Sequence, residues 1–288
     1  MTAETVGQRS EYVDFWNRVL VPKFVRFRHI AVGGMTHHSA KVLPSIGVKE
    51  GDRIVDIGCG FGDTAIELAR LAGASGSVLG VDCCDAFLEY GRRDAAAAGI
   101  GNITFVEADV QSHPFEPAHD VCFSRFGTQF FQNPVMALRN MRKALKPEGA
   151  MTMIVWRALE DNPCMNLPKQ VVLQFLPRPG DDADTCGPGP FSMADKATVT
   201  KQLEIAGYEG IAFERIDAPV MMGKTIDDAI AFQLAIGPAG EVYREAGELT
   251  ADQHDDIVNA LKDELAPYLT PQGVIMESSS WKVSARNP

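Results

Sequence analysis

The chain has 288 residues, of which 45% are hydrophobic and 23% are charged. These values are typical of a globular protein with one large core, and they exclude disorder, collagen-like repeats and fibres as descriptions of the whole chain. With 27 Lys and Arg residues against 38 Asp and Glu residues, the formal net charge is -11. Such acidity disfavours a nucleic-acid partner and an anionic membrane surface, because both are themselves negatively charged.

The six cysteines form no CxxC pair and no regular spacing, which favours reduced thiols and gives no metal-ligand pattern. The N-terminal residues 1–16 contain Glu4, Glu11 and Asp14 and lack a continuous apolar stretch, so they resemble neither a signal peptide nor a transit peptide. No apolar run is long enough to span a bilayer. We therefore expect a cytoplasmic protein without a membrane span and without a bound metal.

The stretch before residue 53 has apolar and aromatic residues, Phe15 to Ile30, at roughly helical spacing. From residue 53 onward, short β-branched runs alternate with longer helical patterns, which indicates an α/β fold with a parallel sheet and helices on both faces. Strands are predicted over residues 53–57, 77–82, 103–107, 120–124 and 150–156. Helices are predicted over residues 63–71, 85–98 and 134–145, and a turn over 146–149.

The sequence changes character after Trp156, because residues 157–191 are rich in proline and contain an acidic cluster. We expect a long irregular insertion there, with one helix near 166–176. The remaining predictions are a helix over 195–206, a strand over 211–220, helices within 225–269 and a last strand over 278–285.

The most informative stretch runs from Val55 to Thr64 and contains Gly58, Gly60 and Gly62 directly after a predicted strand. Glycines at such a position let the backbone turn tightly and approach a ligand. Asp56 lies two residues before the first glycine, and a carboxylate there repels a pyrophosphate but attracts an ammonium or sulfonium group. The spacing also differs from the Gly-x-Gly-x-x-Gly of dinucleotide enzymes. By itself, the glycine turn is compatible with several nucleotide cofactors or with a simple tight turn.

Two further carboxylates follow predicted strands and reduce the number of cofactors that fit the glycine turn. Asp82 ends the second strand, where a carboxylate can accept hydrogen bonds from both hydroxyls of a ribose. Asp109 follows the third strand and could receive an adenine amino group. Together with Asp56 they describe a pocket for an adenosine that carries a positively charged tail.

These features resemble the class I S-adenosylmethionine-dependent methyltransferases, in particular the ubiquinone/menaquinone-biosynthesis-like group of small-molecule enzymes. The resemblance covers residues 53–157 well and is weaker over 158–288. Over residues 1–50 there is almost no resemblance. The matching segments are Val55 to Gly62, Gly80 to Asp82, Glu107 to Val110, Ser124 to Phe131 and Leu145 to Gly149.

The resemblance implies a Rossmann-like seven-stranded, mostly parallel sheet whose final strand is antiparallel, with residues 211–220 and 278–286 as the closing hairpin. It also implies a division of the chain into a cofactor-binding core and two additions over the substrate. The core would comprise residues 51–220 and 274–288, with an N-terminal helical lid over 1–50 and an inserted helical cap over 221–273.

The cofactor implied by the resemblance is S-adenosyl-L-methionine. The glycines would pass beneath its methionine part, Asp82 would hold the ribose, and Asp109 and Val110 would frame the adenine. The full set of expected cofactor-binding residues is Asp56, Gly58, Gly60, Gly62, Thr64, Asp82, Cys83, Asp109, Val110 and Ser124.

We expect methyl transfer to a small, lipophilic or aromatic molecule, because the N-terminal stretch, Phe130–Phe131 and Met221–Met222 are apolar. The acceptor atom (O, N, C or S) stays open, and so does the choice between monomer and homodimer. A protein or RNA acceptor is the alternative, with a nicotinamide-dependent oxidoreductase behind it. A thiol-based acceptor site at Cys83 and Cys84 is a further, weaker reading.

Methyl transfer is an in-line displacement that depends mainly on alignment, so a base is required only when the acceptor arrives protonated. The candidate catalytic residues are His37 and His38, which precede the first strand, and Arg125 at the end of the fourth strand. Each also has a structural interpretation. The histidines could be solvated or packed, and Arg125 could pair with a structural carboxylate.

Overall fold

The computed structural model describes residues 11–180 and 188–288. Residues 1–10 of the expected lid, and Cys186 with the acidic cluster of the insertion, lie outside this part of the chain. Within it, one twisted sheet runs through the molecule in the strand order β3-β2-β1-β4-β5-β8-β6, and a short β7 pairs with β8. The strands are β1 (Arg53–Ile57), β2 (Ser77–Asp82), β3 (Ile103–Glu107), β4 (His119–Arg125), β5 (Leu145–Trp156), β6 (Glu209–Gly223), β7 (Leu269–Thr270) and β8 (Gly273–Arg286).

The predicted seven-stranded architecture is confirmed, with the two-residue β7 as an eighth strand. β1 to β5 pair in parallel, whereas β8 is antiparallel to both β5 and β6. The first three strands have the predicted bounds. β5 begins at Leu145, five residues before the prediction, because the predicted turn is a bulge inside the strand where Glu148 adopts a φ of 62°.

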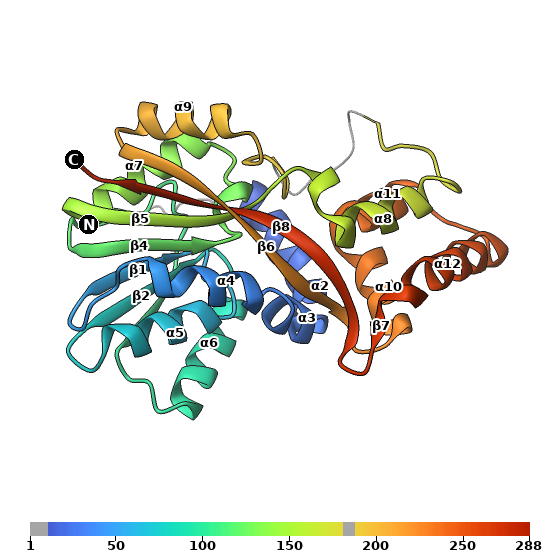
Figure 1. Cartoon of the computed structure of the whole chain (residues 1–288), viewed down its shortest axis with the longest axis horizontal. Helices are drawn as coiled ribbons and strands as arrows, with labels where there is room; N and C mark the ends of the chain where they lie inside the picture. The colour runs from blue at the N-terminus through green and yellow to red at the C-terminus, as the bar shows by residue number, and fades with distance from the viewer. Residues whose placement is uncertain (1–10, 181–187) are drawn as a thin grey trace, which may run out of the picture.

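Helices cover both faces of this sheet, as Figure 1 shows. Ile54 of β1 packs on one face with apolar residues of α4 and α5, whereas its neighbour Val55 packs on the other face with α7 and α9. This alternation is the period of two expected of a strand that is buried on both sides. The helices of the two faces are α4 (Thr36–Val42), α5 (Asp63–Ala72), α6 (Asp85–Ala97), α7 (Pro134–Ala144) and α9 (Lys196–Ala206).

Short N-terminal helices lie between the sheet and a helical group at the far end of the β6–β8 ribbon (Figure 1). Apolar residues of this stretch, such as Phe27 and Ile30, are almost fully buried. The aromatic pattern therefore supplies packing surface, as one of the two readings expects. The elements are α1 (Glu11–Phe15), a π-helical turn (Trp16–Leu20), α2 (Val21–Arg26) and α3 (Arg28–Gly33).

The helical group at the far end, called the cap below, is built from two separate parts of the chain. Three helices come from the insertion between β6 and β8, and α8 joins them from the proline-rich segment that follows β5. β6 also continues to Gly223, three residues into the expected cap range, because its pairing with β8 extends that far. The cap helices are α8 (Pro163–Val172), α10 (Ile226–Ala235), α11 (Gly237–Glu245) and α12 (Ala251–Leu265).

None of the helices in residues 11–180 and 188–288 combines the length and apolar character needed to cross a bilayer.

Candidate functional site

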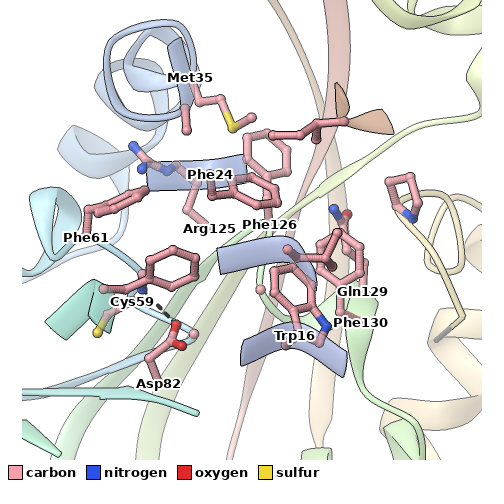
Figure 2. A pocket seen from close by; sticks show the side chains of 18 of the residues that line it. Trp16, Phe24, Met35, Cys59, Phe61, Asp82, Arg125, Phe126, Gln129 and Phe130 are labelled. Carbon is pink, nitrogen blue, oxygen red and sulfur yellow. Dashed lines mark hydrogen bonds between the residues drawn. The ribbon is translucent and has the colours of Figure 1, made fainter. Parts of the chain in front are cut away.

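A continuous cavity of about 280 Å³ lies at the carboxyl ends of β1, β2 and β4, where open α/β sheets bind their ligands. Its first part is bounded by the loop after β1 and by Asp82. Its second part lies between the sheet, the N-terminal helices and the cap, and is lined by apolar and aromatic side chains such as Trp156, Met222 and Phe232. Figure 2 shows Cys59, Phe61 and Asp82 on one side and Trp16, Gln129 and Phe130 on the other.

The glycine loop after β1 has all three glycines in the left-handed region, with φ of 62° at Gly58, 52° at Gly60 and 77° at Gly62. Their roles differ. A Cβ on Gly60 would meet no atom within 4 Å, so this glycine borders open space in the cavity. A Cβ on Gly62 would lie 2.8 Å from the ring of Phe105, so Gly62 allows close packing of the loop. Gly58 and Gly60 line the cavity, whereas Gly62 does not.

Asp82 ends β2 beside this loop and is held by backbone donors. Its Oδ2 accepts the N–H of Gly60 at 2.9 Å, and its Oδ1 accepts the N–H of Cys84 at 3.0 Å. Burial raises the pKa of Asp82 to about 6, although these N–H donors oppose the shift. A carboxylate has about four lone-pair positions, so two remain for hydroxyl groups of a ligand.

Cys83 lines the cavity next to Asp82, and Cys84 is fully buried beneath it. Within the described part of the chain, Asp82, Cys83 and Cys84 are the group whose ligand-type atoms lie within 4.8 Å of one another. The contact of Cys84 with the Cys83 sulfur, together with burial, strongly raises the pKa of the Cys84 thiol. Both Asp82 oxygens already accept backbone N–H groups. The raised pKa keeps the Cys84 thiol protonated at neutral pH, which argues against a thiolate nucleophile at Cys84.

Asp109 and Val110 follow β3 and line the same end of the cavity. Asp109 Oδ1 accepts the backbone N–H of Gln111 at 2.9 Å, so the carboxylate is fixed at the start of a turn. The N–H of Ala108 donates to the carbonyl of Asp82 at 2.9 Å, which brings the ends of β2 and β3 together. The two strand-end carboxylates therefore lie at the same end of the cavity.

Asp56 and Ser124, in contrast, are fully buried and do not line the cavity. Asp56 Oδ2 accepts the hydroxyl of Thr64 at 2.6 Å, while Asp56 Oδ1 and Ser124 Oγ have no partner in the structure. Burial raises the pKa of Asp56 to about 7, and the Thr64 hydrogen bond only partly offsets this. Thr64 does line the cavity, so Asp56 lies one layer behind it, where its carboxylate orients the Thr64 hydroxyl.

The two candidate bases do not line the cavity either. His37 is exposed on the surface of α4. His38 is fully buried, with Nδ1 2.8 Å from the hydroxyl of Ser280 and Nε2 2.7 Å from that of Ser278. Because Ser278 donates its own proton to the carbonyl of Ala218, Nε2 of His38 must be the donor to Ser278 and Nδ1 the acceptor.

The surroundings of His38 keep the imidazole neutral. Burial lowers its pKa to about 4, and the nearby Arg125 cation contributes in the same direction. The ring also packs edge-on against Phe126 and Trp156. These contacts assign His38 to the structural support of the cavity wall, which is the packing interpretation.

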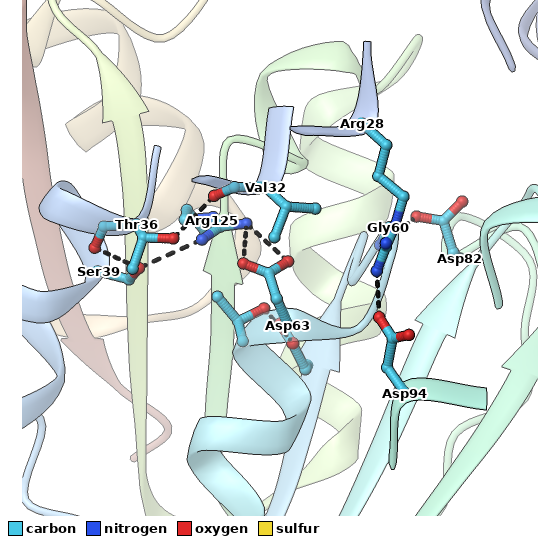
Figure 3. A network of polar contacts seen from close by, with 11 residues as sticks. Arg28, Val32, Thr36, Ser39, Gly60, Asp63, Asp82, Asp94 and Arg125 are labelled. Atoms are coloured by element: carbon cyan, nitrogen blue, oxygen red, sulfur yellow. Dashed lines mark hydrogen bonds and ion pairs between the residues drawn. The ribbon is translucent and has the colours of Figure 1, made fainter. Parts of the chain in front are cut away.

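Arg125 reaches the cavity, but its charge is already paired (Figure 3). Its Nη2 contacts both carboxylate oxygens of Asp63, and its Nη1 donates to the Ser39 hydroxyl at 3.2 Å. The Arg125 side chain is only 10% exposed. These contacts favour the structural interpretation, in which the ion pair joins the end of β4 to the start of α5.

The sequence predicts only some of the residues that line the second, aromatic part of the cavity. The rings of Phe126 and Trp156 are stacked with centroids 3.9 Å apart, and Trp16 stacks on Phe24 at 5.8 Å. No histidine lines the cavity in the part of the chain that the structure describes. The sequence signal for this part was the aromatic N-terminal stretch and Phe130, whereas Trp156 and the cap residues depend on contacts between distant segments.

Comparisons with known proteins agree with this geometry. A family model described as "Methyltransferase domain" matches residues 54–149. The ubiquinone/menaquinone biosynthesis C-methyltransferase UbiE of Azotobacter vinelandii is 30% identical over 184 residues, which cover 61% of this chain and 73% of that protein. The protein of the same name from Pseudomonas putida strain W619 is 37% identical over 152 residues, covering 51% and 59%.

Among solved structures, the YcgJ protein from Bacillus subtilis has a TM-score of 0.58 at 16% identity and covers 87% of this chain and 98% of that chain. Phosphoethanolamine N-methyltransferase 2 of Haemonchus contortus, solved with S-adenosylhomocysteine, has a TM-score of 0.58 at 20% identity and covers 97% and 61%. At these identities the likeness establishes the fold.

Proposed function

Because this chain belongs to the class I S-adenosylmethionine-dependent methyltransferases of the ubiquinone/menaquinone-biosynthesis-like group, we propose that it methylates a small, apolar molecule held between the sheet and the cap. Membership in this family excludes the alternative interpretation as a nicotinamide-dependent oxidoreductase. The proposal concerns the acceptor and the residues that hold the two substrates. The named relatives are C-methyltransferases, which supports carbon as the acceptor atom here as well.

The residues at the first end of the cavity fit S-adenosylmethionine. Gly60 leaves open space where a side chain would stand, and Asp82 keeps two lone-pair positions for the ribose hydroxyls. Asp109 and Val110 provide a carboxylate and an apolar surface for the adenine. When bound, S-adenosylmethionine supplies an electrophilic methyl group on a sulfonium centre. We therefore keep Gly58, Gly60, Thr64, Asp82, Cys83, Asp109 and Val110 as the proposed cofactor-binding residues.

The second end of the cavity supports an apolar acceptor. Its walls are mostly apolar. Aligning two reactants at a site from which the substrates displace water supplies much of the acceleration of a displacement reaction. Because no histidine among the described residues reaches this end, we propose an acceptor whose activation does not depend on a histidine base. Arg125 is proposed to act through position, by holding the glycine loop and α4 together.

One observation carries the proposal: a single cavity joins Gly60 and Asp82 to an aromatic chamber enclosed by the N-terminal helices and the cap. A concave, mostly apolar cavity of this kind suits a small molecule better than a macromolecule. The N-terminal stretch and the cap are thus proposed as the lid and cap over the acceptor.

The test begins with binding of S-adenosylhomocysteine, measured by calorimetry. Asp82→Ala should weaken binding by about 10- to 100-fold, which corresponds to the loss of about 1–3 kcal/mol from hydrogen bonds to a charged group. The matched control is Asp85→Ala, since Asp85 lies three residues on, pairs with Arg92 at the surface and does not line the cavity. Equal affinity of the wild type and Asp82→Ala would remove Asp82 from the site.

The acceptor is then tested with methyl-labelled S-adenosylmethionine and a whole or dialysed cell extract, fractionated into organic-soluble, polar small-molecule, protein and nucleic-acid pools. Label in the organic-soluble pool that disappears on dialysis of the extract supports the proposal. Label that survives dialysis and follows protein or nucleic acid contradicts it and makes the chamber a docking surface for a macromolecule.

A further inference from the structure

The side-chain oxygen of Gln233 is a hydrogen-bond acceptor at the apolar end of the cavity. Gln233 lies on α10 of the cap, is 1% exposed and lines the cavity. Its Nε2 donates to the backbone carbonyl of Cys164, near the start of α8, at 2.8 Å. Because a carbonyl oxygen can only accept, this bond fixes which end of the Gln233 amide is the nitrogen. The other end of the amide, Oε1, is therefore a carbonyl oxygen held in a defined place.

This oxygen has no partner and is open to the cavity. Among the residues that the structure describes, the side chain of Gln233 makes one hydrogen bond, and it makes it through Nε2. Gln129 Nε2 and Trp16 Nε1 on the same cavity are also unpartnered, but they are closed off, whereas Gln233 Oε1 is not. The small accessible surface of Gln233 therefore includes Oε1, so a ligand in the cavity can reach this atom.

The lining side chains beside Gln233 are apolar. Phe232 and Ile236 lie on the same helix, and Met165 follows Cys164 on α8. A carbonyl oxygen in apolar surroundings is costly to remove from water when no group donates to it. A ligand that fills this end of the cavity must therefore donate a hydrogen bond to Oε1 or leave the oxygen unpaired.

We infer that Gln233 selects methyl acceptors that carry an O–H or N–H group, by accepting a hydrogen bond from that group at Oε1. This inference rests on the proposed function, because it names the substrate class at the acceptor end of the same cavity. An ether or a hydrocarbon of the same shape buries Oε1 without a donor and is disfavoured. The bond also orients the acceptor, because its donor group must face α10 while the rest lies among apolar side chains.

The test compares two pairs of probes in which a donor is replaced by a group that cannot donate. Indole and benzofuran differ by N–H against O, and 2-naphthol and 2-fluoronaphthalene differ by O–H against F. Dissociation constants are measured by NMR titration with S-adenosylhomocysteine at saturation, and each pair gives a ratio of the non-donor's constant to the donor's. Gln233→Met should lower this ratio in at least one pair by about fivefold or more, the scale of one hydrogen bond.

Gln233→Glu is the conservative variant and should keep the wild-type ratios. The Glu side chain has nearly the same shape as Gln. Whether it is ionised or donates its proton to the Cys164 carbonyl, it retains an oxygen that can accept from the ligand. A purely structural role predicts instead that Gln233→Met changes the constants of both probes in a pair alike. Unchanged ratios in both pairs overturn the inference.

Gln129→Met is the matched control. Gln129 is also 1% exposed and lines the cavity, but its Oε1 already accepts the backbone N–H of Trp156 at 3.2 Å, and its Nε2 is closed off. Its replacement should leave both ratios unchanged. If Gln129→Met lowers a ratio as much as Gln233→Met does, the assignment to Gln233 is overturned.

The wild-type protein gives a second measurement, in case Gln233→Met does not fold. The side-chain NH2 signal of Gln233 is assigned by its loss in Gln233→Glu. A saturable shift of this signal with a donor probe and not with its non-donor partner supports the inference, and equal shifts within both pairs overturn it. The proposed function fails separately, through the loss of S-adenosylhomocysteine binding or of label transfer to small molecules.

Discussion

Nη2 of Arg125 lies 2.9 Å from Oδ1 and 2.8 Å from Oδ2 of Asp63, so one guanidinium nitrogen is shared between both oxygens of the carboxylate. The pair connects the last residue of β4 to the first residue of α5, directly behind the glycine loop. Through Ser39, Arg125 also contacts α4. The glycine loop and the N-terminal helices are therefore coupled by a single side chain.

Arg125→Met should lower the free energy of unfolding by about 3 kcal/mol, because it leaves the Asp63 carboxylate mostly buried and unpaired. Asp63→Asn in the same chain should recover part of this loss. The comparison pair is Arg70 with Glu67 on α5, whose side chains are 49% and 53% exposed, and Arg70→Met should change stability by less than about 0.5 kcal/mol. Urea unfolding measures all four proteins. Equal losses for the two arginine variants would show that the Asp63 pair is no more important than a surface pair.

Substitutions at two glycines of the loop should affect different properties: Gly60 should matter mainly for ligand binding and Gly62 mainly for stability. Gly60→Ala and Gly62→Ala each place a Cβ at positive φ, which costs about 1–2 kcal/mol of stability. Only Gly62→Ala adds a clash, with the Phe105 ring at 2.8 Å and Gly91 Cα at 3.0 Å. We expect Gly62→Ala to be the less stable variant in thermal unfolding. Gly60→Ala, whose methyl group enters the cavity, should be the variant with weaker S-adenosylhomocysteine binding in calorimetry, by about tenfold or more. If Gly60→Ala were the less stable variant and Gly62→Ala the weaker binder, the positions of the two glycines relative to the cavity would be wrong.

The sequence predicts correctly those elements whose bounds depend on neighbouring residues alone. The bounds of β1, β2 and β3 follow from short apolar runs with β-branched residues, enclosed by glycines and polar residues. These runs are largely buried in β1 and β2 and only partly buried in β3. The start of β5 did not follow, because Pro147 and Glu148 read as a turn and the bulge is stabilised from far along the chain. The side chain of Asn287 donates to the carbonyls of Leu145 and Lys146.

The same distinction applies to the site. Gly60 and Asp82 line the cavity because strand ends and the glycine loop determine their positions. The role of His38 depends on Ser278 and Ser280, which lie 240 and 242 residues away in sequence, so no local pattern could separate a base from a packed ring.

Substitution of each histidine tests whether His38 is a packed structural residue and not a catalytic base. His38→Ala should lower the free energy of unfolding by about 3 kcal/mol, because it removes a fully buried ring and leaves two serine hydroxyls without their partner. His37→Ala, at an exposed position, should change stability by less than about 0.5 kcal/mol.

Methyl transfer by the folded fraction should persist in both histidine variants, measured as label transfer at a temperature well below their unfolding. A general base contributes about 100-fold or more to a rate. A loss of that size in folded His37→Ala or His38→Ala would restore that histidine as a catalytic candidate.

Asp56 makes stability depend on pH in a direction opposite to that of a salt-bridged carboxylate. Its pKa in the folded protein is about 7, above the ordinary value of 3.8, because the carboxyl is fully buried. Between these two values the folded state binds more protons than the unfolded state, so the free energy of unfolding falls as the pH rises from about 4 to about 7.

Asp56→Asn removes this titration while an amide oxygen can still accept the Thr64 hydroxyl. Asp82 titrates in both proteins, so it cancels in the comparison. We expect the variant to lose less stability than the wild type between pH 5 and pH 8, by up to a few kcal/mol in urea unfolding. Parallel pH profiles would mean that Asp56 keeps an ordinary pKa, and its buried, unpartnered Oδ1 would then have to be hydrated.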